Sequence, residues 1–108
     1  MVTKEDISNS LQAMQNRFQG QRAGSMNAVV QLNITGEGGG HWYLTVKDQA
    51  LQITEGQHDR PTATVVTSAD DWLKLVNRQA WGESLYNMGR LQVYGDLYLA
   101  ERLQYLFA

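Results

Sequence analysis

The 108-residue sequence carries few side chains that are placed to do covalent chemistry. Its two histidines, His41 and His58, lie far apart and follow no metal-ligand spacing, so neither a metal nor another cofactor is predicted. The carboxylates Asp70, Asp71 and Glu83 fall near the ends of predicted helices, where capping and the helix dipole account for them. No nucleophile, base and orienting group can be matched from the sequence. We therefore expect a binding protein and not an enzyme.

The tryptophans and their neighbours are more informative. Trp42 lies on the apolar face of a predicted strand, which favours a place in the core, and Trp72 lies on a predicted helix. Trp81, Tyr86 and Met88 occupy an otherwise polar stretch, and core filling and cavity lining stay equally open for them. Methionine and aromatic side chains adapt to varied apolar guests. These residues suit a site for a lipid.

Composition excludes several classes of protein. Hydrophobic residues make up 43% of the chain and charged residues 19%, as in a folded globular protein. We expect one domain over residues 1–108. The net charge of −2 argues against a nucleic-acid partner. There is no cysteine, no apolar run long enough for a transmembrane segment and no signal-peptide pattern, so a cytoplasmic location is expected.

A first helix is predicted over residues 4–19. Thr3 and Asp6 have the spacing of a capping box at its start. Ile7 and Leu11 begin a series of apolar residues at helical spacing. The helix is therefore expected to bury one face.

Five segments alternate apolar and polar residues, which predicts β-strands. The segments are residues 28–35, 41–47, 51–54, 62–67 and 91–94. The glycines at 38–40 lack the Lys-Ser or Lys-Thr of a phosphate loop and are interpreted as a hairpin turn. Short connections and polar alternate positions imply an antiparallel sheet with one covered face and one wetter face.

Three further helices are predicted in the second half of the chain. Ser68 and Asp71 have the spacing of a capping box at the start of one, and a short helix is predicted over residues 83–88. Asp96 is placed to cap the closing helix. That helix is too apolar to present a single buried stripe, so it is expected to contact the sheet and something else.

The order and spacing of several segments resemble the sterol carrier protein-2 domain family over about residues 28–107. The first two are Gly39-Gly40 before the strand Trp42-Tyr43-Leu44-Thr45-Val46, and Leu51 to Gly56. The others are Pro61 to Ser68 leading into Ala69-Asp70-Asp71-Trp72-Leu73-Lys74-Leu75, and Met88 to Asp96 with Leu99-Ala100.

The resemblance implies an α+β fold with a five-stranded antiparallel sheet. About four to five helices would cover one face, with an apolar tunnel between the layers. Family members bind sterols, fatty acids, fatty acyl-CoA or phospholipids without a covalent bond. The expected function is thus binding or transfer of a lipid or fatty acyl ligand, with transient membrane contact. The alternative is a protein-interaction or accessory module, for example in isoprenoid-quinone synthesis, that uses an exposed apolar C-terminal helix. A monomer and a homodimer stay open.

The residues expected to bind the lipid are apolar, with one exception. The strands contribute Trp42, Leu44, Leu91 and Val93, and the middle helices Leu73, Val76, Trp81, Leu85 and Met88. The closing helix contributes Leu99, Leu103, Leu106 and Phe107. Arg90 is the exception and is expected to hold a carboxylate or phosphate headgroup. Whether the closing helix is a lid, part of the core or a partner surface stays open.

Overall fold

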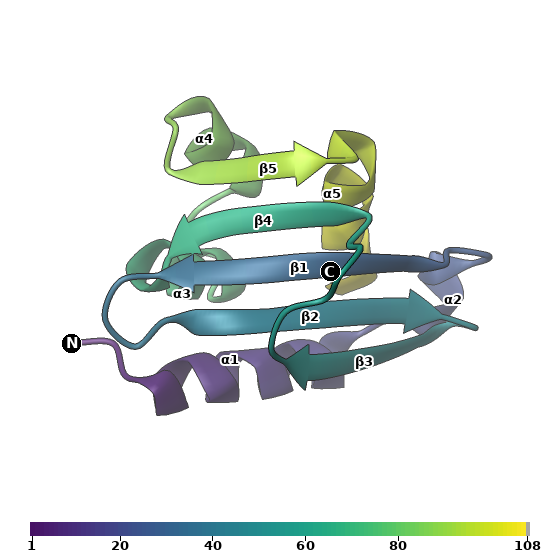
Figure 1. The fold of residues 1–108 in the computed structure, drawn as a ribbon, viewed down its shortest axis with the longest axis horizontal. Helices are drawn as coiled ribbons and strands as arrows, with labels where there is room; N and C mark the ends of the chain where they lie inside the picture. The colour runs from purple at the N-terminus through teal and green to yellow at the C-terminus, as the bar shows by residue number, and fades with distance from the viewer. Residues whose placement is uncertain (108) are drawn as a thin grey trace.

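A computed structural model describes residues 1–107 and shows an α+β fold, in which one five-stranded sheet carries a layer of helices (Figure 1). The strands are β1 (Ala28–Thr35), β2 (Gly40–Lys47), β3 (Ala50–Glu55), β4 (Ala63–Ser68) and β5 (Leu91–Gly95). The helices are α1 (Lys4–Arg17), α2 (Gly20–Ala23), α3 (Ala69–Val76), α4 (Gly82–Asn87), α5 (Leu97–Leu103) and the 3₁₀-helix η1 (Gln104–Phe107).

The sheet is mixed, which corrects the prediction of a wholly antiparallel one. Its strand order is β3-β2-β1-β4-β5, and the central pair β1 and β4 is parallel, with Val30 opposite Ala63 and Ile34 opposite Thr67. The other neighbours are antiparallel. The reason is the return of the chain after β3: residues 56–62 cross back over the sheet, so β4 starts at the end where β1 starts. A sequence pattern of alternation does not distinguish the two directions.

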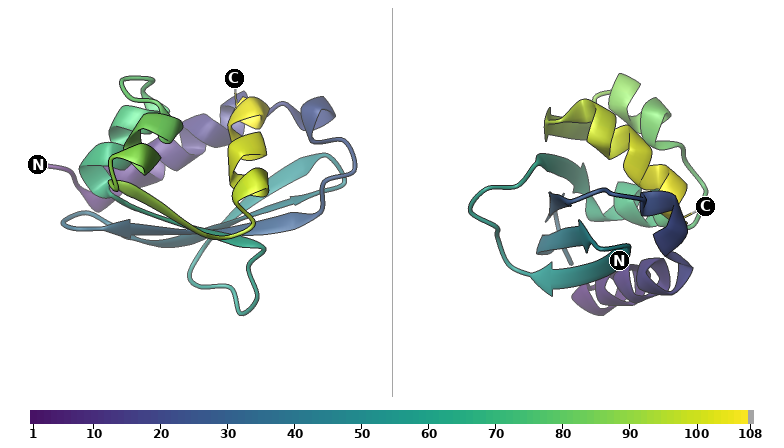
Figure 2. Two further views of the ribbon diagram at one scale, coloured as in Figure 1. Left: turned by 90° about the horizontal axis from the view of Figure 1, so that it is seen from above. Right: turned by 90° about the vertical axis from the view of Figure 1, so that its right-hand side faces the viewer.

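The helices cover one face of the sheet, and the crossing loop 56–62 lies on the other (Figure 2). Gln31, on β1, anchors this loop although its own side chain is buried. Its amide nitrogen donates to the carbonyl oxygen of Gly56 at 3.1 Å, and its amide oxygen accepts from the backbone N–H of His58 at 2.8 Å. A buried amide is stable only when its polar atoms are paired, so these contacts fix the loop against the sheet.

The caps explain where the helices begin. Thr3 Oγ1 accepts from the N–H of Asp6 at 3.1 Å, and the N–H of Thr3 donates to Asp6 Oδ2 at 2.9 Å, which confirms the capping box of α1. Ser68 caps α3 through the N–H of Asp71, and Asp96 caps α5 through the N–H of Leu99. The helix α1 ends at Arg17, two residues before the predicted end.

The core lies between the covered face of the sheet and the helices. Alternate side chains of β1 and β2, Val30 and Leu32 with Leu44 and Val46, are each at most 2% exposed. Ile7 of α1 is fully buried against them in the same cluster. Burial of these side chains removes apolar surface from water and supplies most of the stabilisation.

A buried hydrogen bond joins α1 to α3. The indole N–H of Trp72 donates to Ser10 Oγ at 2.9 Å, and the Ser10 hydroxyl donates to the carbonyl oxygen of Ile7 at 2.6 Å. Trp72 is 5% exposed and Ser10 is 7% exposed. A buried indole N–H without an acceptor is costly, so Ser10 determines how closely the two helices dock.

Replacing Ser10 tests this link. Ser10→Ala should lower the free energy of unfolding by about 1.5 kcal/mol, because the indole N–H of Trp72 loses its acceptor. Ser8→Ala, an exposed change on the same helix, should alter it by less than about 0.5 kcal/mol. Urea unfolding of the three proteins measures both. Equal stabilities for the two variants would contradict the role given to Ser10.

Candidate functional site

An apolar cavity of about 410 Å³ lies among the helices, with α5 and η1 forming part of its wall. This volume is within the range of roughly 300–1,000 Å³ that small-molecule sites occupy. The lining side chains are Met14, Arg17, Trp72, Leu75, Val76, Arg78, Ala80, Trp81, Leu103, Gln104 and Phe107. They come from α1, α3, the α3–α4 link, α5 and η1. The cavity therefore lies within the helical layer and not between sheet and helices, where the tunnel is predicted.

The cavity has a buried side and an exposed rim. Met14 and Trp72, both less than 10% exposed, lie on the buried side. Phe107 forms part of the wall, and its ring packs against Phe18 with the centroids 5.7 Å apart. Trp81, at 79% exposure, lies at the rim. An apolar molecule can thus enter past an aromatic side chain and reach buried apolar surface.

Within residues 1–107, Arg17 and Arg78 are the charged side chains that line the cavity. Arg17 Nη2 donates to the carbonyl oxygen of Val76 at 3.2 Å, and Arg78 Nη2 donates to that of Phe107 at 3.5 Å. Neither forms an ion pair with another residue of the described range 1–107. Positive charge beside an apolar space favours a guest with an anionic end.

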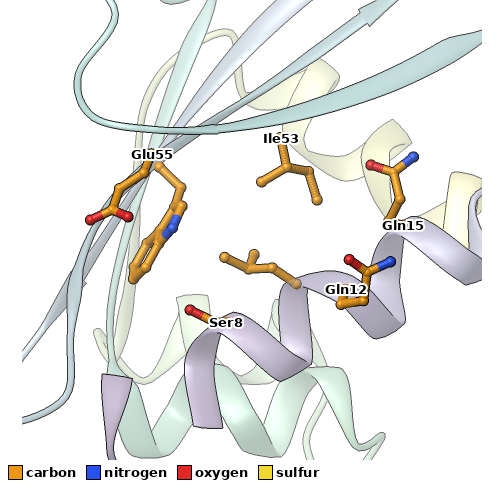
Figure 3. Close-up of a pocket in the computed structure, with 7 residues that line it drawn as sticks. Ser8, Gln12, Gln15, Ile53 and Glu55 are labelled. Carbon is orange, nitrogen blue, oxygen red and sulfur yellow. The ribbon is translucent and has the colours of Figure 1, made fainter. Parts of the chain in front are cut away.

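A second hollow, of about 280 Å³, lies between α1 and the edge strand β3 (Figure 3). In Figure 3, Ile53 and Glu55 on the strand face Ser8, Gln12 and Gln15 on the helix. Leu11 and Trp42 complete the lining. Most of these side chains are polar, and Glu55 is already paired with Lys4 Nζ at 2.8 Å. This groove is poorly suited to an apolar guest, and the cavity among the helices is the better candidate.

The structure brings some of the predicted site residues together and places the rest elsewhere. Val76, Trp81, Leu103 and Phe107 line the cavity. In the core are Trp42, Leu44, Leu85, Leu91, Leu99 and Leu106, with Leu73 and Val93 packed against it. Met88 is 60% exposed, away from the cavity lining. Strand residues do not reach the cavity because their side chains pack directly on the helices.

Arg90 is engaged by another side chain. Its Nη2 and Nε lie 2.6 and 3.1 Å from the two carboxylate oxygens of Asp71, whose side chain is 5% exposed. This paired geometry joins the start of α3 to the residue before β5. It also explains why Asp71 does not complete a capping box with Ser68. Arg90 does not line the cavity.

Sequence reasoning missed several residues of the cavity. Met14 belongs to the apolar series of the first helix, and Trp72 precedes Val76 by one helical turn. The helical spacing in the sequence is therefore sufficient to place both beside other apolar residues. Arg17 ends that same first helix, but nothing in its spacing indicates a cavity. Arg78 and Gln104 have no signal in the sequence, because only the docking of η1 near the α3–α4 link brings them to one site.

Within residues 1–107, no three His, Cys, Asp or Glu side chains are grouped so that they could hold a metal ion. In the same part of the chain, no helix has both the length and the apolar character needed to cross a bilayer.

Comparison with known proteins identifies the family. The sequence model of the SCP-2 sterol transfer family matches residues 9–108. The chain belongs to this family. Hydroxysteroid dehydrogenase-like protein 2 of Mus musculus is 29% identical over 80 residues, which are 73% of this chain and 16% of that protein. The chain thus spans about a sixth of that relative's length.

Solved structures of SCP-2 proteins share the fold. Palmitated SCP2L2 from Aedes aegypti has a TM-score of 0.73 at 21% identity, covering 90% of this chain and 89% of that one. UbiJ-SCP2, a ubiquinone synthesis protein, has a TM-score of 0.70 at 19% identity, covering 98% and 92%. At these identities the likeness establishes the SCP-2 fold for this chain and nothing about its ligand.

Proposed function

We propose that this SCP-2 domain binds a lipid non-covalently in the cavity among its helices and transfers it between membranes or partner proteins. The ligand classes are a fatty acid, fatty acyl-CoA, sterol or phospholipid. The observation that supports this most directly is the cavity of about 410 Å³ with its apolar walls. Membership of the SCP-2 sterol transfer family and the palmitated form of SCP2L2 support it from outside the chain.

Hydrophobic burial alone is sufficient for useful affinity. Each buried methylene contributes about 0.8 kcal/mol. About ten methylenes would then contribute about 8 kcal/mol, close to the free energy of micromolar binding, before the cost of ordering the chain. A single acyl chain can therefore be held without a strong polar contact, and released again, as transfer requires.

Native mass spectrometry of gently purified protein tests the proposal. We expect a co-purified mass of a few hundred daltons that disappears under denaturing conditions (an acyl chain of roughly sixteen to eighteen carbons falls in this range). Protein stripped of lipid should regain a bound species when it is incubated with palmitate. Protein that stays free of ligand in both measurements would contradict lipid binding.

The rim residue Trp81 gives a second test. Binding of a fatty acid should shift and strengthen tryptophan fluorescence, because a side chain that is 79% exposed passes from water into contact with acyl chain. Trp81→Phe should remove most of the change, since Trp72 is already buried before binding. Trp42→Phe, outside the cavity, should keep it. A full response in Trp81→Phe would remove Trp81 from the entrance.

The alternative function is a protein-interaction or accessory module. The exposed side chains Leu97, Tyr98 and Tyr105 on α5 and η1, at 41%, 68% and 70%, are the observation that favours it. The UbiJ-SCP2 neighbour, a ubiquinone synthesis protein, is consistent with an accessory role in isoprenoid-quinone synthesis. A lipid-free dimer in the native mass spectrum that Tyr98→Ala converts to monomer would support this function over the carrier.

A further inference from the structure

Two arginines at the apolar cavity indicate which kind of lipid it takes. Arg17 lies in the last turn of α1 and is half-buried, whereas Arg78 lies in the α3–α4 link and is exposed. Both line the cavity, and no carboxylate side chain of residues 1–107 does. Among the described residues, the charged side chains of the lining are thus all positive. A neutral lipid gains nothing from this charge, whereas an anionic one does.

With respect to residues 1–107, both guanidinium groups have hydrogen-bond donors that no protein acceptor uses. Each guanidinium has five N–H donors. Among the described residues, each arginine makes one side-chain hydrogen bond to a protein acceptor, and both acceptors are neutral backbone carbonyls. The bond from Arg78 to Phe107 is long at 3.5 Å, so it can be exchanged for a stronger partner at low cost. A carboxylate is such a partner, because charge-assisted hydrogen bonds are roughly twice as strong as neutral ones.

The apolar walls and the charged side chains together define an amphiphile. Met14, Trp72 and Leu103 offer apolar surface to a hydrocarbon chain, while the arginines offer donors to its polar end. The volume of about 410 Å³ suits one chain better than the two chains of a phospholipid. Gln104, whose amide lies close to Gly82, adds a neutral polar group to the lining.

We propose that Arg17 and Arg78 form an anion-selective entrance, so that the cavity takes single-chain amphiphiles with a carboxylate headgroup in preference to neutral lipids such as alcohols and sterols. This inference rests on the proposed function, because it assigns a ligand class to the same cavity. Arg17 anchors the inner side of the headgroup, and Arg78 closes over it from the solvent side.

The test compares ligands that differ only in the headgroup. Binding of dodecanoate, dodecan-1-ol and dodecyl sulfate, each below its aggregation limit, is measured by displacement of a fluorescent fatty acid. Dodecanoate should bind about tenfold or more tightly than the alcohol at low salt. This preference should shrink in 0.5 M NaCl, while alcohol binding stays the same, because the exposed part of the site is screened. Tighter binding of the sulfate than of the carboxylate would overturn the assignment of a carboxylate headgroup.

The variants identify the arginines responsible. Arg17→Gln and Arg78→Gln should each weaken dodecanoate binding by about tenfold and leave dodecanol within about twofold. Arg78→Lys should recover part of the loss, since it keeps the charge. Arg60→Gln, an exposed arginine in the 56–62 loop on the opposite face, is the matched control and should change neither ligand.

The outcomes separate this inference from the proposed function. Equal affinity of the wild-type protein for dodecanoate and dodecanol would overturn the anion-selective entrance and leave lipid binding intact. Binding of neither ligand would overturn the anion-selective entrance, and the native mass spectrum would then decide separately whether the proposed function stands. Equal loss of dodecanoate and dodecanol binding in the arginine variants would show that the arginines only support the cavity wall, which also overturns the inference. The wild-type comparison decides the question even if a variant fails to fold.

Discussion

Leu106→Ala should lower the free energy of unfolding by about 3 kcal/mol. The Leu106 side chain is 1% exposed and belongs to the core cluster, although it lies only two residues from the end of the sequence. Its carbonyl oxygen accepts from the backbone N–H of Gln19 at 2.6 Å, which ties η1 to the segment after α1. Removing a fully buried leucine side chain loses its transfer free energy and leaves a void.

Urea unfolding measures this effect, and two variants serve as comparisons. Leu97→Ala, at a position 41% exposed on α5, should cost less than about 1 kcal/mol. Phe107→Ala, which alters a half-buried side chain of the cavity wall, should weaken lipid binding more than it weakens the fold. A loss below about 1 kcal/mol in Leu106→Ala would show that η1 is not anchored in the core.

The last residues thus have different roles in succession. Tyr105 is 70% exposed, Leu106 lies in the core and Phe107 lines the cavity. The alternatives for the closing segment, a lid, a part of the core or a partner surface, therefore apply to individual residues and not to the segment as a whole. A truncation that removes all of them would mix a folding defect with any effect on the ligand. Single substitutions keep the two apart.

Arg90→Ala should lower the free energy of unfolding by about 2 kcal/mol. The Asp71 side chain is 5% exposed. Among residues 1–107, its carboxylate forms an ion pair with Arg90. Loss of Arg90 leaves that negative charge buried without compensation, which is costly. The figure is below that of a fully buried pair because Arg90 is 50% exposed and its charge is partly screened by water.

A double-mutant cycle isolates the pair. In an Asp71→Ala background, Arg90→Ala should cost less than about 0.5 kcal/mol, because no buried charge is left unpaired. Arg60→Ala, in the exposed loop, should be close to neutral in both backgrounds. Equal losses from Arg90→Ala with and without Asp71 would disprove the coupling. We also expect Arg90→Ala to keep the preference for dodecanoate over dodecanol, in contrast to the Arg17 and Arg78 variants.

Local features of the fold could be predicted from the sequence because local chemistry causes them. The capping box at Thr3 and the N-cap at Asp96 are decided by residues three apart and form as predicted, whereas Ser68 makes only its half of the predicted capping box, because the Asp71 carboxylate pairs with Arg90. The alternation in residues 28–35 and 41–47 likewise follows from a sheet with one covered face. Each of these depends on a few neighbouring residues, which is the range at which a sequence pattern carries information.

Features that depend on residues distant in sequence could not be predicted in this way. The parallel pairing of β1 with β4 follows from the path of residues 56–62 across the face of the sheet opposite the helices (Figure 2). An arginine after a glycine in a loop gives no sign in the sequence that it will pair with Asp71, 19 residues earlier. The sequence predicts a cavity against the strands, but the side chains there, such as Trp42 and Leu44, are buried in the core. Space among the helices depends on side-chain volumes that no periodicity reveals.

Because the cavity lies within the helical layer, its volume can change without any change in the pairing of the strands. Its walls can move apart without lengthening any strand-to-strand hydrogen bond, because every lining residue belongs to a helix or a link. Among the described residues, Gln19, Arg22 and Arg78 each donate one hydrogen bond to a backbone carbonyl oxygen of η1. Substitutions at lining positions can therefore enlarge or reduce the space while β1 to β5 keep their register. Evolution can thus reshape the cavity by single substitutions that leave the sheet, and with it most of the core, unchanged.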